Sequence, residues 1–519
     1  MGSVGPNIFD YLLAGKEEGR EALNTLQQTY TYGQLRSAAT DIASHLISSG
    51  GKKGDRVLLI ADNSFFWVAT YLGVLLAGLV CVPLPPIIDP EDLELILTTT
   101  GAGICFLQTA LVRKYIDRLR GVRIVTDGVA PRPEALNLAQ LATQPRIAQT
   151  ELPTVNASDL AALMFTSGST GQPRGVMVSH ANIRANTESI IEYLELTSND
   201  RIMTVLPFHY CFGTSLLHTH LRVGGSLVID PRFMYPEKVL QRMQETECTG
   251  FAGVPSHYQV LVRKTGLRKK SFPHLRYVQQ AGGHLAVPFL RELHEALPQT
   301  KIFVMYGQTE ATARLSYLPP HLLSTKMGSI GRGIPGVKLA VLNDKGIAVQ
   351  PGEVGEIVAE GPNIASGYWQ APEETALSFR NGKLHTGDLA IVDNEGFISI
   401  VGRSRDFLKC GGKRISCHHI EQQLLEWGEL LEAAVIGIPD EMMGEAVKAF
   451  VVPRPGLTLV EDHLLEFCRK RLSFELVPRE IVVMEALPKN QSGKVLKEKL
   501  RALAPSVLVS LQDSENPLT

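Results

Sequence analysis

The chain has 519 residues, of which 44% are hydrophobic and 20% charged, and its formal net charge is −2. A chain of this length is too long to fold around one ordinary hydrophobic core, which predicts at least two domains. The near-neutral charge argues against a nucleic-acid-binding protein. The seven cysteines are scattered without a CxxC pair, which fits a reducing compartment better than a disulfide framework.

Over the first 310 residues, short apolar runs alternate with segments that suit crossover helices. We expect buried strands at 55–61, 161–165, 225–230 and 301–307. The apolar run from Tyr71 to Pro86 is too short to span a membrane and predicts a buried helix that leads into a strand. This alternation is typical of an α/β fold with largely parallel sheets. With no signal peptide or spanning helix in view, we expect a cytoplasmic protein.

After Val337 the pattern changes twice. Two runs rich in turn residues, 337–361 and 390–403, predict β-hairpins in a small barrel or sheet. A charged, glycine-rich segment follows at residues 404–416, and after it a short α+β unit. We expect helices near 418–427 and 461–472, and strands at 432–438 and 448–453. The predicted domains are therefore 1–404 and 405–519.

The stretch FTSGSTGQPRGVMVSH, residues 165–180, resembles a phosphate-binding loop in composition. Small residues let backbone amides face a bound anion, and hydroxyls add donors. It is not a Walker A loop, because residues 173–175 read Pro-Arg-Gly. A flexible surface turn is the alternative on composition alone. The formal GxGxxG match at 331–336 has no strand before it and no helix after it, so we interpret it as a turn.

Six motifs in order place this loop in a known context. They are FTSGSTGQPRG (165–175), LPFHYCFG (206–213), YGQTE (306–310), HTGDL (385–389), GRSRDFLKCGGKRIS (402–416) and PKNQSGK (488–494). Together they resemble the acyl-adenylate-forming superfamily, which includes acyl-CoA synthetases, peptide-synthetase adenylation domains and firefly luciferase. The resemblance covers nearly the whole chain. It implies a large N-terminal domain of two stacked α/β subdomains plus a small β-barrel, and a small mobile α+β C-terminal domain.

The resemblance also implies a reaction in two steps, with ATP, Mg²⁺ and coenzyme A as cofactors. A carboxylate attacks the α-phosphate of ATP to give acyl-AMP and pyrophosphate, and a thiol then attacks the acyl-AMP. Lys494 corresponds to the family's catalytic lysine, Glu310 to its metal carboxylate and Thr309 to a phosphate contact. The structural alternatives are a solvated lysine in a basic tail for Lys494 and an exposed loop acid for Glu310.

The nucleotide contacts implied by the resemblance are Thr166, Ser167, Gly168, Ser169, Thr170, Gly171, Arg174, Gly282, Gly283, Tyr306, Gly307, Asp388 and Arg403. Within this set, Tyr306 corresponds to the residue on the adenine face. Asp388 and Arg403 correspond to the ribose contacts, although Asp-Gly turns and hinge arginines also occur for structural reasons. Arg174 departs from the family, since most relatives have Lys there, and its planar fork changes how the loop would hold the β- and γ-phosphates.

The same resemblance assigns the second step and the acid. Arg405 matches the hinge about which the C-terminal domain rotates, and Gly411 and Gly412 match the path of the pantetheine thiol. His209, Tyr210 and His284 match positions beside the acyl pocket, with core packing as the alternative for the first two. The stretch 206–213 has no Asp to hold an α-amino group, so we expect an apolar acyl or aryl acid.

Several alternatives remain open from the sequence. The acceptor of the acyl group is coenzyme A or the phosphopantetheine of an acyl carrier protein, and a relative that runs only one half-reaction is a third option. A different class is a non-catalytic protein that binds nucleotide or acyl-AMP. A luciferase-type oxygenase would reveal itself by light or oxygen consumption. The sequence leaves the oligomeric state open between a monomer and a homodimer.

Overall fold

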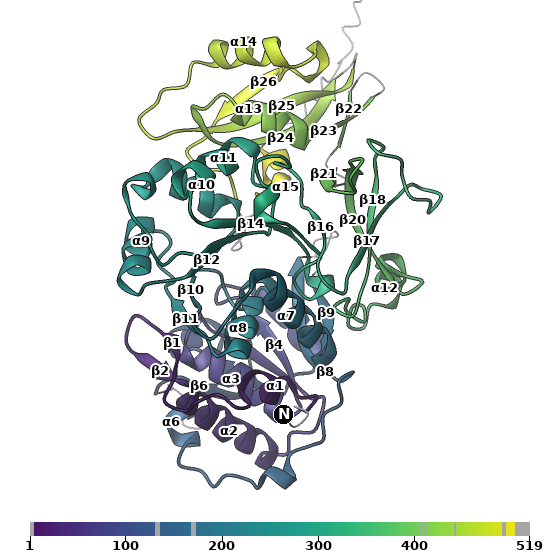
Figure 1. Cartoon of the computed structure of the whole chain (residues 1–519). Helices are drawn as coiled ribbons and strands as arrows, with labels where there is room; N and C mark the ends of the chain where they lie inside the picture. The colour runs from purple at the N-terminus through teal and green to yellow at the C-terminus, as the bar shows by residue number, and fades with distance from the viewer. Residues whose placement is uncertain are drawn as a thin grey trace, which may run out of the picture. The chain divides into compact units, whose positions relative to one another are not determined.

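The computed structural model describes residues 5–129, 135–167, 173–403, 407–410, 413–440, 443–489 and 495–503. The chain divides into two compact units, one of Met1–Leu285 with Phe289–Ile400 and the other of Ala286–Pro288 with Val401–Thr519. Described residues form three sheets in the first unit and one in the second (Figure 1). The functional boundary expected after residue 404 stays a prediction.

A seven-stranded sheet in the first unit has the strand order β7-β6-β5-β3-β4-β8-β9. Its neighbours are parallel except for the antiparallel pair β8–β9, which confirms the expected parallel pattern. The strands are β3 (Arg56–Ile60), β4 (Val80–Leu84), β5 (Ile104–Leu107), β6 (Arg123–Thr126), β7 (Leu136–Asn137), β8 (Leu160–Ser167) and β9 (Pro173–Ser179). The helices in this part of the chain are α2 (Tyr32–Ser48), α3 (Phe65–Leu76), α4 (Pro90–Thr100), α5 (Val112–Tyr115) and α6 (Leu138–Leu141).

A nine-stranded sheet has the order β16-β15-β14-β13-β12-β10-β11-β1-β2, with a parallel centre from β14 to β1. The strands are β1 (Glu21–Asn24), β2 (Thr29–Thr31), β10 (Arg201–Thr204), β11 (Ser226–Ile229), β12 (Gly250–Gly253), β13 (Tyr277–Gln280), β14 (Lys301–Tyr306), β15 (Ser316–Leu318) and β16 (Arg332–Gly333). The accompanying helices are α1 (Ile8–Leu13), α7 (His180–Leu194), α8 (Cys211–Val223), α9 (Pro236–Glu245), α10 (Pro255–Lys264) and α11 (Val287–Ala296).

One continuous apolar core joins these two sheets. It contains side chains from β3, β4 and β8 of the first sheet, from β10, β11 and β14 of the second, and from helices α2, α3, α7 and α8. Helix α3 is buried over nearly its whole length, as its predominantly apolar sequence requires, and it leads into β4. The run 71–86 therefore has the structure expected from its sequence, although the helix already begins at Phe65.

Helices in this core begin at residues with the chemistry of an N-cap. Thr31 and Ser179 each accept a hydrogen bond from the third residue of the helix that follows, α2 and α7 respectively. The amide side chains of Gln34 and Asn182 complete these two capping boxes. Both starts are consequently set by short local motifs, whereas the direction of each helix follows from the apolar face that it buries.

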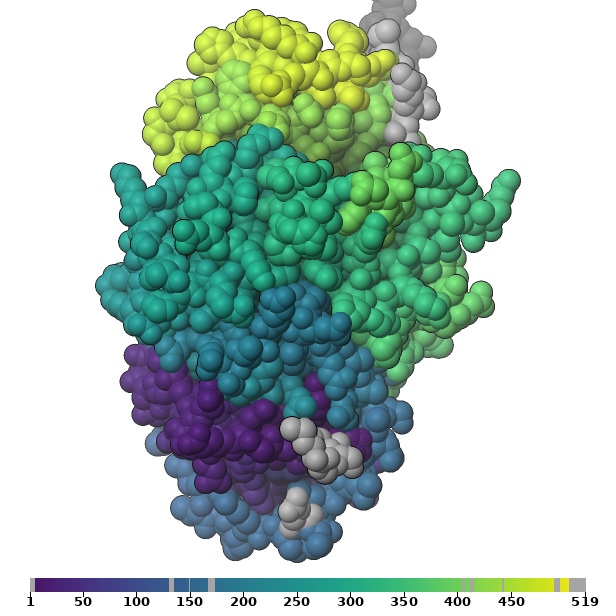
Figure 2. Space-filling view, viewed as in Figure 1, coloured from purple at the N-terminus to yellow at the C-terminus, as the bar shows by residue number. Residues whose placement is uncertain are grey.

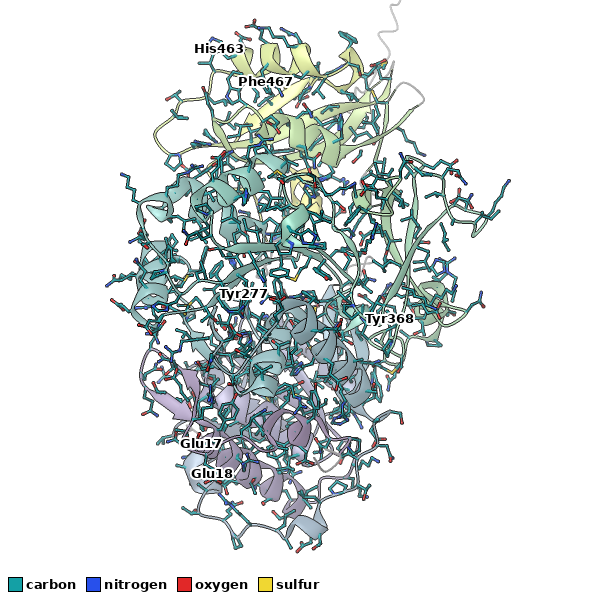
Figure 3. The ribbon with its side chains drawn as sticks, in the orientation of Figure 1. Glu17, Glu18, Tyr277, Tyr368, His463 and Phe467 are labelled. Carbon is teal, nitrogen blue, oxygen red and sulfur yellow. The ribbon has the colours of Figure 1, made fainter. Side chains whose placement is uncertain are left out.

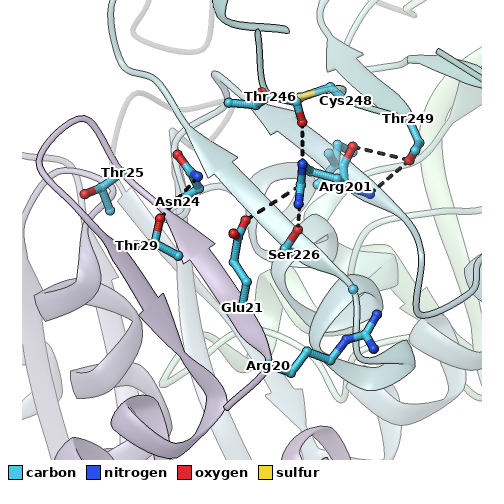
Figure 4. Close-up of polar contacts among 12 residues, drawn as sticks. Arg20, Glu21, Asn24, Thr25, Thr29, Arg201, Ser226, Thr246, Cys248 and Thr249 are labelled. Atoms are coloured by element: carbon cyan, nitrogen blue, oxygen red, sulfur yellow. Dashed lines mark hydrogen bonds and ion pairs between the residues drawn. The ribbon is translucent and has the colours of Figure 1, made fainter. Parts of the chain in front are cut away.

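The N-terminal segment that contains β1 and β2 joins the nine-stranded sheet, and polar side chains hold it at the amino ends of the parallel strands. Arg201 lies at the start of β10; its Nη1 donates to the Thr246 carbonyl (2.6 Å) and its Nε to Ser226 Oγ (3.3 Å), while Nε lies 3.7 Å from Glu21 Oε1 (Figure 4). In the space-filling view this purple segment lies directly against teal residues from beyond position 200 (Figure 2). The side chains of Lys16 and Arg20 hold this segment in place by donating hydrogen bonds to the backbone carbonyls of Arg222 and Gly224, respectively.

The third sheet has five strands, and its pairs β17–β18, β18–β20 and β19–β20 are antiparallel, which confirms the expected hairpins. The strands are β17 (Lys338–Leu342), β18 (Gly355–Glu360), β19 (Phe379–Arg380), β20 (Lys383–Val392) and β21 (Ile398–Arg403), and helix α12 spans Pro372–Ser378. Its buried side chains pack against Tyr306 and Leu315. The GxGxxG match at 331–336 forms the short strand β16 and then a turn at Gly336, with no helix after it.

The second unit is a separate α+β structure. Its sheet has the order β23-β22-β25-β24, and β26 pairs with β25. The strands are β22 (Phe407–Cys410), β23 (Lys413–Ser416), β24 (Leu430–Asp440), β25 (Gly444–Pro453) and β26 (Glu480–Val483), and the helices are α13 (Cys417–Leu425), α14 (Glu461–Arg471) and α15 (Lys497–Ala502). The expected helices and strands of this region are confirmed. Among the described helices of both units, none combines the length and apolar character that crossing a membrane requires.

Candidate active site

The carboxyl ends of four neighbouring parallel strands place several predicted residues along one sheet edge. Strands β10, β12, β13 and β14 are adjacent and parallel. The segment after β10 carries His209 and Tyr210, the segment after β13 carries Gly282 and Gly283, and the segment after β14 begins at Gly307. In open α/β sheets, ligands bind at this edge. The topology thus gathers motifs that lie about a hundred residues apart in the chain.

Tyr306, the last residue of β14, is joined to Asp388 on β20. The Tyr306 hydroxyl donates to Asp388 Oδ2 at 2.7 Å, and both residues are buried, with exposures of 9% and 5%. The backbone N–H of Asp388 also donates to Thr386 Oγ1 at 3.2 Å. The hydrogen bond fixes the orientation of the carboxylate relative to the aromatic ring. The two side chains expected at the adenine and the ribose are therefore neighbours, while their nucleotide contacts stay predictions.

Gly307 follows at the point where the chain leaves β14. A Cβ added here would lie 2.0 Å from the carbonyl oxygen of Ala313. Such an approach between heavy atoms is impossible without moving backbone. The residue therefore has to be glycine for the segment 307–313 to turn back tightly, and this turn sets the position of Thr309 and Glu310.

Gly282 and Gly283 lie just beyond β13. Gly282 has φ +81°, and a Cβ there would meet Val254 Cγ1 at 2.9 Å, so backbone conformation and space both select glycine. The Gln280 side chain donates to the Gly283 carbonyl at 2.7 Å and holds this segment in place. His284 comes next in the chain and is partly exposed. The expected close approach of backbone to a ligand is compatible with this geometry.

Glu310 lies in a short 3₁₀ turn, Thr309–Ala311, directly after the tight turn. Its Oε1 accepts a hydrogen bond from the Tyr368 hydroxyl at 2.8 Å; Tyr368 is labelled in Figure 3. Burial and the adjacent Glu310 carboxylate raise the pKa of Tyr368, so the hydroxyl remains a donor at neutral pH. A partly exposed carboxylate positioned by a neutral hydroxyl suits a hard cation such as Mg²⁺.

Thr309 contacts the first residue of α8. Its Oγ1 donates to Cys211 Sγ at 3.5 Å, and burial raises the pKa of the Cys211 thiol. The thiol is consequently protonated at neutral pH and contributes no charge. This contact links the segment after β14 with the start of α8, two parts of the sheet edge that the sequence motifs alone do not connect.

The predicted phosphate loop connects β8 and β9, an antiparallel hairpin in which Thr166 is paired with Arg174. The Arg174 guanidinium lies 3.7 Å from Glu374 Oε1 and 5.8 Å from the ring centre of Tyr368. Arg174 therefore lies beside the ring whose hydroxyl binds Glu310. The loop residues Gly168, Ser169, Thr170 and Gly171, and the side chain of Ser167, lie outside what the structure describes.

His209 and Tyr210 precede helix α8. Burial lowers the pKa of His209 to about 3, so its ring is neutral at physiological pH. Its Nε2 is buried and has no hydrogen-bond partner among the described residues. The rings of His209 and Tyr210 lie 4.3 Å apart between centroids. A neutral, buried His209 ring beside the partly exposed ring of Tyr210 is compatible with an apolar pocket, and the gating role stays a prediction.

The remaining predicted residues belong to the second compact unit. Arg403 is the last residue of β21. Arg405, Gly411, Gly412 and Lys494 fall outside the residues that the structure describes. Their expected roles at the hinge, in the thiol path and in adenylation accordingly stay predictions.

Tyr368 and Glu374 contact predicted site residues, yet neither lies in one of the six sequence motifs. Tyr368 joins Arg174 and Glu310, and its segment pairs with β9 through an antiparallel bridge to Val176. Neither residue lies in a stretch with a periodic pattern or a glycine-rich loop. The available signal was compositional only: two aromatic residues followed by two acids on a short proline-initiated helix, in the stretch 368–374.

The chain matches two family models over most of its length. A model described as AMP-binding enzyme covers residues 13–369, and one described as AMP-binding enzyme C-terminal domain covers 419–494. Among curated relatives, a feruloyl-CoA synthase of Amycolatopsis sp is 32% identical over 91% of this chain and 93% of its own. A long-chain-fatty-acid–CoA ligase of Salmonella typhimurium is 29% identical, with coverage of 95% and 93%. The ATP-bound structure of MatB from Rhodopseudomonas palustris superposes with a TM-score of 0.87 at 29% identity, covering 96% of this chain and 99% of that one.

Proposed function

The chain belongs to the AMP-binding enzyme family and is an ATP-dependent acid–CoA ligase that works through an acyl-adenylate, and we propose that its acid is an apolar aliphatic or aryl carboxylate. The nucleotide site is supported most directly by Tyr306 at the carboxyl end of β14, whose hydroxyl binds Asp388 on β20, and by Glu310 in the turn that follows β14. A solved relative holds ATP. The relatives are named for different acids. The identity of this chain's acid therefore has to be inferred from the residues of its own pocket.

In the proposed adenylation step, a carboxylate oxygen of the acid bonds to the α-phosphorus of ATP. The bond from that phosphorus to the bridging oxygen breaks, and pyrophosphate leaves with the electron pair. Two anions have to meet, so fixed positive charge at the developing pentavalent centre lowers the barrier. We assign that charge to Lys494, which is cationic at neutral pH.

Other residues of this chain bind and orient the nucleotide in this proposal. Asp388, held by Tyr306, accepts ribose hydroxyls, and the β8–β9 hairpin with Arg174 faces the phosphates. Glu310 would hold Mg²⁺, which supplies screening of the phosphate charge when bound. Because Arg174 is already 3.7 Å from Glu374, a triphosphate has to share or replace that ion pair.

The second step transfers the acyl group to the thiol of coenzyme A. The sulfur bonds to the acyl carbon, the bond from that carbon to the AMP oxygen breaks, and AMP leaves while the thiol proton passes to solvent. Gly411 and Gly412 would leave room for the pantetheine arm, and rotation about Arg405 would exchange them for Lys494. In this proposal Lys494 serves the site in the first step, and Gly411 and Gly412 serve it in the second. A separate small unit is needed because it can rotate to exchange them.

The residues around the predicted pocket support the proposed substrate class. Residues 302–305 of β14 are apolar and buried, and His209 is neutral, so this wall offers no charge to a polar acid. The stretch 206–213 contains no acid that would hold an α-amino group. Aliphatic and aryl acids therefore fit better than free amino acids.

The experiment below also separates two alternatives to this function. A carrier-protein phosphopantetheine presents the same thiol as coenzyme A, so the site chemistry does not distinguish the two acceptors. A non-catalytic nucleotide-binding protein is favoured only by Arg174 in place of Lys. A cytoplasmic location is also part of the proposal, and all seven cysteines are free thiols in the structure.

Product analysis by mass spectrometry tests the proposal. With ATP, Mg²⁺ and a panel of fatty, aryl and amino acids, we expect adenylates from the apolar acids and none from the amino acids. Adding coenzyme A should convert each adenylate to its thioester. An adenylate that persists with coenzyme A but is consumed by a phosphopantetheinylated carrier protein would favour that acceptor. No adenylate from any acid, together with no thioester from synthetic acyl-adenylate and coenzyme A, would favour the non-catalytic protein.

A further inference from the structure

The segment that carries Lys494 is bounded by structure that holds both of its ends. Lys489 and Val495 form an isolated antiparallel bridge, and the N–H of Leu496 donates to the Pro488 carbonyl at 2.8 Å. Residues 490–494 lie between these points and outside what the structure describes. The described residues that flank Lys494 are therefore 488–489 and 495–496.

Apolar packing anchors the two flanks in one core cluster of the second unit. Leu487 and Leu500 are buried in it, and Val495 packs against it. The cluster also contains Leu431 and Phe450 from strands β24 and β25. This packing fixes the flanks against the sheet, but it is not directional. A further restraint is needed to prevent the flanking segments from rotating or sliding.

Two ion pairs add contacts between opposite charges, one on each flank. Lys489 Nζ lies 2.6 Å from Glu432 Oε2, and Lys497 Nζ lies 2.7 Å from Glu421 Oε1. All four side chains are largely buried, with exposures between 11% and 24%. Glu432 belongs to strand β24 and Glu421 to helix α13, so both carboxylates are mounted on regular elements rather than on loops.

Glu421 is itself held from two further sides. Its Oε1 accepts the backbone N–H of Val435 at 2.8 Å, and His418 Nδ1 lies 3.8 Å from its Oε2. Burial alone would raise the pKa of Glu421, but Lys497 and His418 outweigh it and lower the pKa to about 2. The carboxylate is therefore ionised throughout the physiological range and offers Lys497 a fixed partner.

We propose that Glu421 and Glu432 are positioning residues for adenylation, because each anchors a lysine on one side of the segment that carries Lys494. The inference rests on the proposed function, in which Lys494 serves the first step only. Partly buried ion pairs contribute little net stability, since desolvation offsets their attraction. Their geometric effect is larger, because misplacing a catalytic group by about 1 Å can cost about 10²-fold in rate.

The test measures the two half-reactions separately in the full-length protein. For Glu421→Gln and Glu432→Gln, we expect acyl-adenylate formation to fall by about 10- to 100-fold. Thioester formation from supplied acyl-adenylate and coenzyme A should stay within about twofold of the parent, because Lys494 is not used there. In the background of Lys494→Ala, either substitution should cause no further loss of adenylation, since residues that act as a unit are non-additive.

A matched control comes from the same unit. Glu480→Gln removes the partner of Lys448, 2.6 Å away on β25 and β26, and should leave both half-reactions unchanged. The inference is overturned if adenylation by the two test variants is unaffected, or if both half-reactions fall together with the melting temperature. A parent protein that forms no adenylate from any acid would instead remove the proposed function, and this inference with it.

Discussion

Replacing Lys494 with Ala should reduce acyl-adenylate formation by about 10²–10³-fold, the loss typical of removing one fixed contact to charge that develops in the transition state. The same variant should still convert supplied acyl-adenylate and coenzyme A to thioester at close to the parent rate. The two rates are measured as pyrophosphate release with ATP and acid, and as thioester formation from synthetic acyl-adenylate. The contrast between them is what assigns Lys494 to the first step.

Lys499→Ala is the matched control for this experiment. Lys499 lies on helix α15, is exposed, and follows Lys494 closely in the same basic stretch. Loss of a surface charge there should change neither rate, since exposed charges contribute little. If Lys494→Ala and Lys499→Ala behave alike, Lys494 is an ordinary solvated lysine and its catalytic assignment is wrong.

Glu310→Gln should lower adenylation by about 10²–10³-fold and raise the Mg²⁺ concentration needed for half-maximal rate. The substitution keeps the size of the side chain and removes the charge that would hold the cation. Because Tyr368 donates to Glu310 Oε1, the Gln carbonyl can keep this hydrogen bond, and the fold should be unaffected. The measurement is a Mg²⁺ titration of pyrophosphate release, with the melting temperature recorded alongside.

Glu373→Gln controls for removal of a carboxylate as such. Glu373 is exposed on helix α12, and its replacement should leave the Mg²⁺ dependence unchanged. A Glu310→Gln enzyme with the parent Mg²⁺ dependence would show that the cation is held elsewhere. In that case the hydrogen bond from Tyr368 to Glu310 is structural.

Much of the fold could be predicted from local patterns. Apolar runs identified the strands that became β3, β8, β11 and β14, and the turn residues after Val337 identified the antiparallel sheet. These features depend on side-chain period and on turn chemistry, both of which are local. The bounds shifted by a residue or more, because hydrogen bonds with neighbouring strands decide where a strand ends. Helix α3, for example, began earlier than its apolar run suggested.

The site was predicted as a set of motifs, whereas its geometry required the structure. Tyr306 and Asp388 are separated by 82 positions in the chain, and no local pattern indicates that they share a hydrogen bond. Tyr368 was missed for the same reason, because its importance lies in reaching both Glu310 and Arg174. The pairs formed by Glu421 and Glu432 likewise depend on where α13 and β24 pack, which is set by the core and not by the neighbouring sequence.

The central claim is that the acid's carboxylate attacks the α-phosphate and that the adenylate is then opened by a thiol. Oxygen-18 in the carboxylate follows this directly, in a reaction with ATP, Mg²⁺, a labelled acid that the enzyme accepts, and coenzyme A. The attacking oxygen becomes the bridge of the acyl-adenylate and remains on phosphorus when the thiol displaces AMP. The account predicts one labelled oxygen in each AMP and none in pyrophosphate. Unlabelled AMP, or label in inorganic phosphate with ADP as the nucleotide product, would contradict it.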